Sequence, residues 1–141
     1  MTDLLSNVTV AIAEEIDIVH VRQSARQAAV AAGLSLVQQT KLVTAASELA
    51  RNALIHGNGG QAEITVEHTP PTTTVALTFT DSGPGIADID QALSDGFTTG
   101  NGLGLGLGGA RRLADRFDIH SVPGQGTTVR IGFTVRRKPG S

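Results

Sequence analysis

The sequence DSGPGIADIDQALSDGFTTGNGLGLGLGG, residues 81–109, contains two clusters of glycine that are the most informative feature of the chain. The first cluster runs from Asp81 to Gly85 and follows an apolar segment typical of a strand. A carboxylate at the end of a strand can accept a hydrogen bond from an amino group, and glycines let a flat ring approach the backbone. These are the requirements of an adenine pocket, although the run by itself fits an ordinary Asp-Ser-Gly-Pro-Gly turn more readily.

The second cluster places glycine at nearly every other position from 100 to 109, with leucines between the glycines and a predicted helix behind them. A flexible loop whose amides point inward and which leads into a helix N-terminus is well suited to hold phosphates. The interleaved leucines argue against a simple linker, because a linker has no need of apolar anchors. This cluster therefore predicts a phosphate-binding loop.

Two other glycine motifs fail their requirements in this chain. Gly104, Gly106 and Gly109 match G-x-G-x-x-G, but no buried strand precedes them, as a dinucleotide-binding turn requires. A P-loop needs a lysine directly after its last glycine, and the lysines of the chain are Lys41 and Lys138. The glycine loop is therefore expected to belong to another class of nucleotide site.

A third motif lies on the helix predicted over residues 35–57. Glu48, Asn52 and His56 recur at intervals of four residues and project from one side of it, at the rim of the apolar stripe. There the Asn52 amide oxygen can reach Mg²⁺, and the Glu48 carboxylate can orient or deprotonate a hydroxyl. On an isolated helix the same pair would be ordinary surface residues. His56 fits a polar residue near a helix C-terminus, and the four histidines show no metal-ligand spacing.

The hydrophobic pattern of the whole chain predicts an α/β (α+β) fold of two layers, with helices on one face of a mostly antiparallel mixed sheet. Ser35 is the expected N-cap of the second helix, and Gly33 and Gly57 are the expected helix ends. Helices are predicted over residues 17–33, 35–57, 89–93 and 107–117. Strands are predicted over residues 8–13, 62–66, 75–79, 118–122 and 127–135. No repeat or linker divides residues 1–141, so a single domain is expected.

The composition excludes several classes of function. The chain has 40% hydrophobic and 17% charged residues and a net charge of -2, which is typical of a globular domain. Having no cysteine, it has neither disulfides nor thiolate zinc sites nor a cysteine nucleophile. The near-neutral charge and the four aromatic residues, all Phe, argue against nucleic-acid binding. No apolar run could span a bilayer and no secretory signal is recognisable, so we expect a cytoplasmic protein that binds no membrane.

In chain order, these motifs resemble the ATP-binding (Bergerat) fold of the GHKL superfamily, which gyrase, Hsp90, histidine kinases and MutL share. The order is the helix with Glu48 and Asn52, then Asp81-x-Gly-x-Gly, then the glycine loop, then the run from Gly124 to Thr127. The run SELARN at residues 47–52, together with DIVHVR at residues 17–22, resembles most closely the RsbT-type serine/threonine switch kinases of bacterial stress-signalling complexes. The resemblance implies a protein serine/threonine kinase that uses ATP and Mg²⁺.

The resemblance also implies a role for each motif residue. Glu48 would be the general base, Asn52 would be the Mg²⁺ ligand, and Asp81 would accept a hydrogen bond from the adenine amino group. The other nucleotide-binding residues that it implies are Gly83 and Gly85 at the base, Gly102, Gly104 and Gly106 in a lid over the phosphates, and Thr127 in support of the adenine site. The segment 96–109 contains no Lys or Arg, so the nearest candidates to meet the γ-phosphate are Arg111 and Arg112.

Partners, finally, are implied by the resemblance. The substrate would be a serine or threonine of a STAS-domain antagonist (RsbS/RsbR-like), and its phosphorylation would release the kinase to engage a PP2C-type phosphatase or a related regulator. Arg22 and Arg26, one turn apart on the first helix, are candidates for the contact surface or form a solvated basic face. Two alternatives stay open: an RsbW/SpoIIAB-like anti-sigma factor kinase, and a non-catalytic binding module whose partner affinity ATP controls.

Overall fold

The computed structural model describes residues 2–94 and 106–136, whose five strands form one sheet. The strands are β1 (Asp3–Ile12), β2 (Gly60–Thr69), β3 (Thr72–Asp81), β4 (Arg116–Val122) and β5 (Gly126–Arg136). They lie in the order β1-β2-β3-β5-β4, and each neighbouring pair is antiparallel. The predicted α+β architecture is confirmed. The expectation of a mixed sheet is wrong for the described residues.

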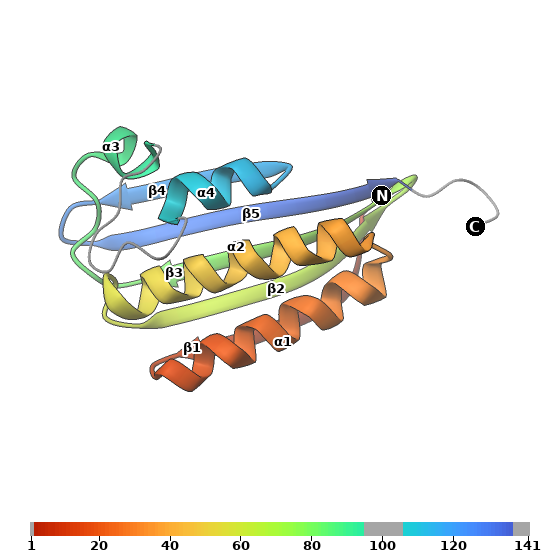
Figure 1. Cartoon of the computed structure of the whole chain (residues 1–141), viewed down its shortest axis with the longest axis horizontal. Coiled ribbons are helices and arrows are strands. Elements are labelled where there is room, and N and C mark those ends of the chain that lie inside the picture. The colour runs from red at the N-terminus through yellow and green to blue at the C-terminus, as the bar shows by residue number, and fades with distance from the viewer. Residues whose placement is uncertain (1, 95–105, 137–141) are drawn as a thin grey trace.

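The connections between the strands explain why no parallel pair forms in this part of the chain. Two helices, α1 (Glu15–Ala32) and α2 (Leu36–Ile55), join β1 to β2. They run in opposite directions and return the chain to the end of the sheet at which β1 stopped (Figure 1). The next strand must therefore run antiparallel to β1. The strands β3 and β4 point the same way, but β5 lies between them and pairs with both.

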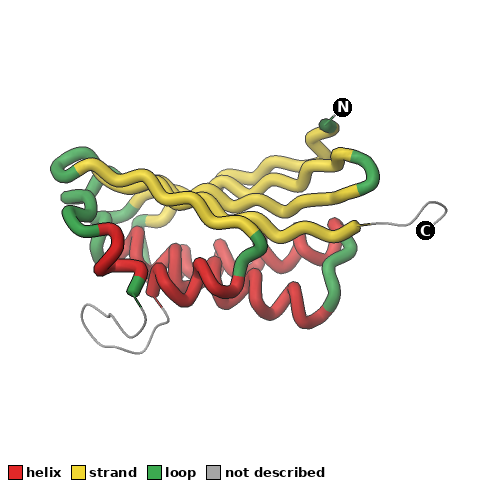
Figure 2. Tube along the Cα trace, turned by 90° about the horizontal axis from the view of Figure 1, so that it is seen from above, coloured by secondary structure: helices red, strands yellow, loops and turns green. Residues whose placement is uncertain are grey.

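The helices of the described residues all lie on one face of the sheet, which gives the two layers that the sequence predicts (Figure 2). Besides α1 and α2, the helical layer contains α3 (Ile89–Leu93) and α4 (Gly106–Leu113). The helix α2 lies at the centre of this layer, since it packs against α1 on one side and α4 on the other. Its position makes it the scaffold of the helical side of any site at the end of the sheet.

The helix boundaries follow from capping side chains. The sequence predicts Asp17 as the first residue of α1, but in the structure it is the N3 residue of that helix. The Asp17 Oδ2 atom accepts hydrogen bonds from the Ala13 and Glu14 amides at 2.9 Å each. This capping box starts the helix two residues earlier. Gly33, with a φ of 83°, ends α1, and the Ser35 hydroxyl caps α2, both as predicted.

The predicted helix end at residue 117 is wrong, because α4 ends at Leu113. The Asp115 amide donates a hydrogen bond to the Gly132 carbonyl at 3.0 Å. The Asp115 carboxylate accepts one from the Thr134 amide at 2.9 Å. Both bonds tie the chain to β5, so the residues that follow continue as a strand instead of another helical turn.

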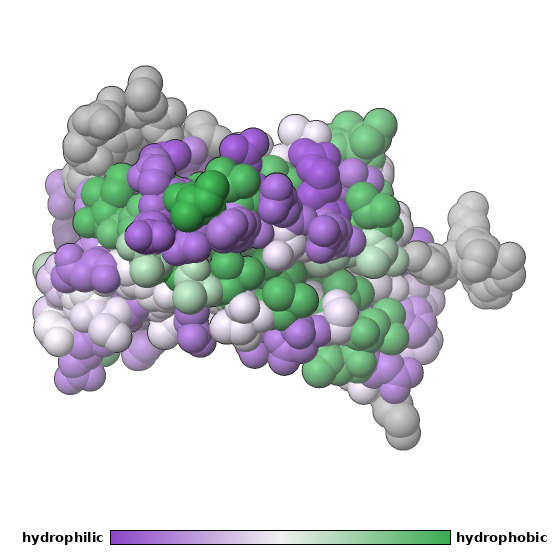
Figure 3. Space-filling model, turned by 90° about the horizontal axis from the view of Figure 1, so that it is seen from below, coloured by the Kyte–Doolittle hydropathy of each residue, from purple (hydrophilic) through white to green (hydrophobic). Residues whose placement is uncertain are grey.

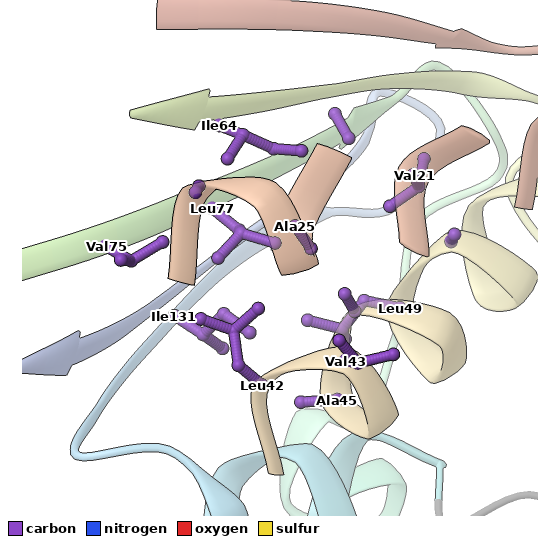
Figure 4. Close-up of a cluster of buried hydrophobic side chains, with 14 of the residues drawn as sticks. Val21, Ala25, Leu42, Val43, Ala45, Leu49, Ile64, Val75, Leu77 and Ile131 are labelled. Atoms are coloured by element: carbon purple, nitrogen blue, oxygen red, sulfur yellow. The ribbon is translucent and has the colours of Figure 1, made fainter. Parts of the chain in front are cut away.

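The hydrophobic core fills the space between the two layers. The apolar stripes predicted on both long helices are buried, and Val21 and Leu42 are fully inaccessible. Figure 4 shows how the helical side chains face those of the sheet, among them Val21, Ala25, Leu42, Leu49, Ile64, Val75, Leu77 and Ile131. Because α2 is anchored along its length, its polar residues at the rim of the core are held in fixed positions.

We expect the stability of the protein to depend on the ionisation of Asp17. Hydrogen bonds from the Ala13 and Glu14 amides lower the pKa of this carboxyl from its usual value of 3.8. Its stabilising contribution is therefore complete above the unfolded-state pKa and is lost as the pH falls through the folded-state pKa. Asp17→Asn should lower the Tm at neutral pH and differ progressively less from wild type below about pH 4. Thermal unfolding across this range checks it, and a difference independent of pH would contradict it.

Candidate functional site

Four residues from neighbouring strands form a row across the end of the sheet at which β3 stops. The register pairs Gly60 with Asp81, Asp81 with Thr127, and Thr127 with Ser121. Residues opposite each other in antiparallel strands share a face and have Cβ atoms about 5 Å apart. Phe79, two residues before Asp81, is buried in the core, so the row lies on the same, helix-covered face. Polar side chains therefore close this end of the apolar core.

The turn that follows Asp81 packs tightly against the chain just after α2. The Asp81 Oδ1 atom accepts a hydrogen bond from the Gly83 amide at 3.0 Å. A Cβ atom on Gly57 would overlap the Asp81 carboxylate, and one on Gly83 would lie 2.6 Å from the Gly57 Cα atom. The end of α2 and the Asp81 turn are thus in backbone contact, and they meet at one end of the molecule (Figure 1).

The other side of the same turn packs against the β4–β5 connection. The Gly124 amide donates a hydrogen bond to the Pro84 carbonyl at 2.7 Å. Gly85 has a φ of 77°, and a Cβ atom there would overlap the Val122 carbonyl oxygen. The sequence predicts Gly83 and Gly85 as residues that make room for a base. The structure adds a reason that the sequence did not predict, which is the close approach of the protein's own backbone.

A hydroxyl network links Thr127 to the turn. The Ser121 Oγ atom lies 2.8 Å from the Thr127 Oγ1 atom, and it accepts a hydrogen bond from the Ile86 amide at 2.7 Å. Thr127 is buried, at 9% exposure, and Asp81 and Ser121 are half-buried. The structure therefore brings together Asp81 and Thr127, two residues from distant segments for which the family resemblance implies a role at the adenine site.

Glu48 and Asn52 lie one turn apart on α2, and both are half-buried. They flank the core, since Leu49 and Ala53 beside them are buried. The Gly57 amide donates a hydrogen bond to the Asn52 carbonyl at 3.2 Å, so the backbone of Asn52 adjoins the residue that contacts Asp81. Among the described residues, no hydrogen bond or ion pair involves the side chain of Glu48 or Asn52, so their oxygen atoms are available to a ligand.

These donors fit Mg²⁺ bound together with a nucleotide. Mg²⁺ prefers oxygen ligands and is commonly held by one or two protein groups together with phosphates and water. The Asn52 amide and the Glu48 carboxylate are oxygen donors of this kind. Across residues 2–94 and 106–136 there is no cluster of three or more His, Cys, Asp or Glu side chains that could hold a metal ion alone. A Mg²⁺ ion at these two residues would therefore need further oxygen ligands, which nucleotide phosphates could supply.

The predicted phosphate loop is only partly within the described residues. Gly102 and Gly104 lie outside them. Gly106 begins α4 with a φ of 66°, so the helix N-terminus predicted behind the loop is confirmed. Gly108 belongs to this helix and not to a loop, and a Cβ atom there would overlap the Leu93 carbonyl oxygen. Close packing against the end of α3 therefore accounts for this glycine. The two residues that the sequence offers as γ-phosphate ligands, Arg111 and Arg112, lie in α4 and have exposed side chains.

Sequence reasoning missed Gly57 and Ser121 as parts of the site. Gly57 was interpreted only as a helix stop, and no local signal reveals its contact with Asp81. Ser121 had a usable signal, because it continues the alternation of Phe117 and Ile119 and so falls on the helix-covered face of β4. A serine at the end of an apolar alternation indicates a polar rim to the core.

The fold and the site define the class of protein. Residues 37–137 match the family described as "Histidine kinase-, DNA gyrase B-, and HSP90-like ATPase". Serine/threonine-protein kinase RsbT of Bacillus subtilis is 41% identical over 121 residues, which are 86% of this chain and 91% of that protein. The chain therefore belongs to this ATP-binding family and, within it, to the partner-switching serine/threonine kinases related to RsbT.

Other relatives agree with this placement. The anti-sigma F factor of Bacillus licheniformis is 36% identical over 97 residues, which are 65% of this chain and 66% of that protein. Among solved structures, the RsbU and RsbW domains of a Mycobacterium tuberculosis protein superpose with a TM-score of 0.61 at 18% identity. That alignment covers 91% of this chain and 32% of the longer chain, and it supports the fold alone. None of the helices in the described part of the chain has the length and hydrophobicity of a transmembrane span.

Proposed function

We propose that this chain, as one domain of residues 1–141, is an ATP- and Mg²⁺-dependent kinase that phosphorylates a serine or threonine of a STAS-domain protein in a cytoplasmic bacterial partner-switching pathway. The observation that carries the proposal is the placement of Asp81 and Thr127 side by side at the end of α2. The same helix bears Glu48 and Asn52. The relationship to RsbT over most of both chains supports a kinase rather than another nucleotide-binding protein.

The adenine base would bind at the polar row, with the phosphates directed toward α4. Asp81 uses one carboxylate oxygen for the Gly83 amide and keeps lone pairs for the adenine amino group. The phosphates would be covered by the lid of Gly102, Gly104 and Gly106. The first amides of α4 have no partner within their own helix and suit an anion.

Phosphoryl transfer would need one base and charge neutralisation. The Asn52 amide oxygen would help to hold Mg²⁺, which would neutralise part of the phosphate charge. Glu48 takes the proton of the substrate hydroxyl as that oxygen bonds to the γ-phosphorus. The bond between the γ-phosphorus and the bridging oxygen breaks, and ADP leaves with that oxygen. The half-buried position of Glu48 at the rim of the core keeps the carboxylate on a rigid helix.

A groove along α1 is the surface we assign to the protein partner. Its lining includes Arg22, Arg26, Val19 and Val30 of α1, together with Val43 of α2. Val19 and Val30 are 39% and 59% exposed. Among the described residues, no carboxylate lies within 4.0 Å of the Arg22 or Arg26 side chain. The ion pairs in this part of the chain are formed by other basic side chains.

This groove suits a partner that presents acidic side chains around an apolar contact. Figure 3 views the molecule from the side at which α1 lies, and hydrophobic and strongly hydrophilic residues alternate there. We assign the groove to the STAS-domain substrate. After its phosphorylation the released kinase would be free for a PP2C-type phosphatase or a related regulator.

The test is transfer of labelled γ-phosphate to purified STAS-domain proteins in the presence of Mg²⁺. We expect labelling of a serine or threonine in one of them. Combining Arg22→Glu with Arg26→Glu should raise the KM for this protein by about tenfold through like-charge repulsion, with the Kd for ATP unchanged. Arg116→Glu, on β4 at the opposite edge of the sheet, is the matched control. An unchanged KM would contradict the docking surface but not the kinase.

A second candidate function is that of an anti-sigma factor kinase, favoured by relatives such as the anti-sigma F factors of Bacillus licheniformis and Bacillus subtilis, which are 36% and 33% identical to this chain. ATP binding without transfer to any STAS-domain protein, together with a stable complex with a sigma factor, would support it. ATP binding with neither transfer nor a sigma factor complex would identify a non-catalytic module gated by ATP.

A further inference from the structure

Ser121, on β4, forms three hydrogen bonds with a single hydroxyl. Its Oγ atom lies 2.7 Å from the Ile86 amide nitrogen, 3.1 Å from the Gly126 carbonyl oxygen and 2.8 Å from the Thr127 Oγ1 atom. Ile86 follows the turn that Asp81 begins, whereas Gly126 and Thr127 are the first residues of β5. Ser121 therefore connects the nucleotide turn to the strand that carries Thr127. None of the sequence motifs includes this residue.

Only one placement of the hydroxyl protons satisfies all three contacts. The Ile86 amide can only donate and the Gly126 carbonyl can only accept, so Ser121 accepts from the first and gives its one proton to the second. A hydroxyl oxygen can accept two hydrogen bonds. The contact between the two hydroxyls is then satisfied only when Thr127 donates its proton to Ser121. The Thr127 hydroxyl has then used its only proton, so toward any other partner it can act only as a hydrogen-bond acceptor.

We propose that Ser121 is a positioning residue that holds the Thr127 hydroxyl as a hydrogen-bond acceptor and so makes the nucleotide site selective for a purine with a 6-amino group. The inference rests on the proposed nucleotide site. Thr127 stands directly opposite Asp81 in the sheet, and the carboxylate oxygens of Asp81 also accept hydrogen bonds. Two adjacent acceptors match the amino group of adenine, which donates. They oppose the 6-oxo group of hypoxanthine, which accepts.

Without Ser121, Thr127 could not discriminate between these bases. A free hydroxyl rotates and either donates or accepts, so it would adapt to an amino group or to an oxo group. Thr127 is 9% exposed, and water therefore has little access to a mismatched pair. A buried acceptor that faces another acceptor loses the full value of a hydrogen bond. The selectivity thus depends on the direction in which the Thr127 proton points, and Ser121 sets that direction.

The test compares the Kd values of ATP and ITP, which differ at the 6-position of the base, by calorimetry on the full chain. The ATP preference should fall about fivefold in Ser121→Ala, the equivalent of one net hydrogen bond. It should also fall in Thr127→Val, with no further fall in the double variant. Ser121→Thr keeps the hydroxyl and should retain the preference. Thr128→Ala, on the opposite face of β5, is the matched control and should leave it unchanged.

Several results would overturn the inference. An unchanged ATP-to-ITP ratio in folded Ser121→Ala would do so and would leave the kinase proposal intact. Additive losses in the double variant would show that Ser121 acts independently of Thr127. Thermal unfolding without nucleotide reports whether each variant folds, and if Ser121→Ala does not, an unchanged ratio in Thr127→Val overturns the inference by itself. Wild-type protein that binds neither nucleotide would overturn the proposed function, and the inference with it.

Discussion

Glu48→Gln is expected to lower kcat for phosphoryl transfer by about 10²- to 10⁴-fold and to leave the Kd for ATP within about twofold of wild type. Glutamine has nearly the same shape as glutamate but cannot take a proton from the substrate hydroxyl. The side chain is half-buried at the rim of the core beside the buried Leu49, and glutamine would occupy nearly the same volume there. Single-turnover transfer and calorimetry, measured on the same preparation, separate the chemical step from binding.

The matched control is Glu63→Gln, a half-buried carboxylate of β2 that alternates with the core residues Ala62 and Ile64 and so lies on the open face of the sheet. This variant should keep full activity. Transfer that persists in Glu48→Gln would exclude Glu48 as the base. Loss of ATP binding in the same variant would instead show that the carboxylate contributes to the nucleotide complex and not to proton transfer alone.

Gly57→Ala is expected to weaken ATP binding by at least about tenfold, although Gly57 itself carries no chemical group. A Cβ atom at this position overlaps the Asp81 carboxylate and lies 2.6 Å from its Oδ2 atom. Overpacking of this kind costs about 1–3 kcal/mol, and here the carboxylate is the group that has to move. A shift of about 1.4 kcal/mol in binding corresponds to the tenfold loss. Calorimetric titration with ATP measures it.

Gly132→Ala provides the control for adding a methyl group. A Cβ atom on Gly132 would meet side-chain atoms at 3.6 and 3.7 Å, which are ordinary van der Waals contacts. This variant should bind ATP as wild type does. The loss of ATP affinity in Gly57→Ala can be compared with the loss in Asp81→Asn, in which the carboxylate itself is replaced. Unchanged ATP affinity in Gly57→Ala would mean that the Asp81 carboxylate does not contact the base.

The elements of the fold could be predicted because they depend on local patterns. The alternation of Val129, Ile131 and Phe133 predicted β5, and the Ser35 cap and Gly33 end were both found. The errors lie at boundaries where tertiary contacts act. The long helix predicted to residue 117 stops earlier because Asp115 is bonded to β5. Propensity alone cannot anticipate a hydrogen bond between distant segments.

The candidate site likewise has one part that local sequence patterns predict and another part that depends on tertiary contacts. The four-residue spacing of Glu48 and Asn52 determines that they share one side of α2, since helix geometry is local. The pairing of Asp81 with Thr127 is a matter of strand register. Register was open at the level of sequence, because the alternation of β5 fits the sheet equally well after a shift of two residues along its neighbours.

By itself, the sequence determined the number and type of most elements and the face that each buries, and it predicted the candidate residues of a nucleotide site. The tertiary structure decided which of these residues meet: that β5 lies between β3 and β4, that Thr127 stands opposite Asp81, that Gly57 leaves no room beside that carboxylate, and that the Ser121 hydroxyl is hydrogen-bonded to that of Thr127. The physical reason is the distance along the sequence over which each kind of interaction acts. Helix and strand patterns arise between residues a few positions apart, whereas the site depends on contacts that form only when the whole core is packed.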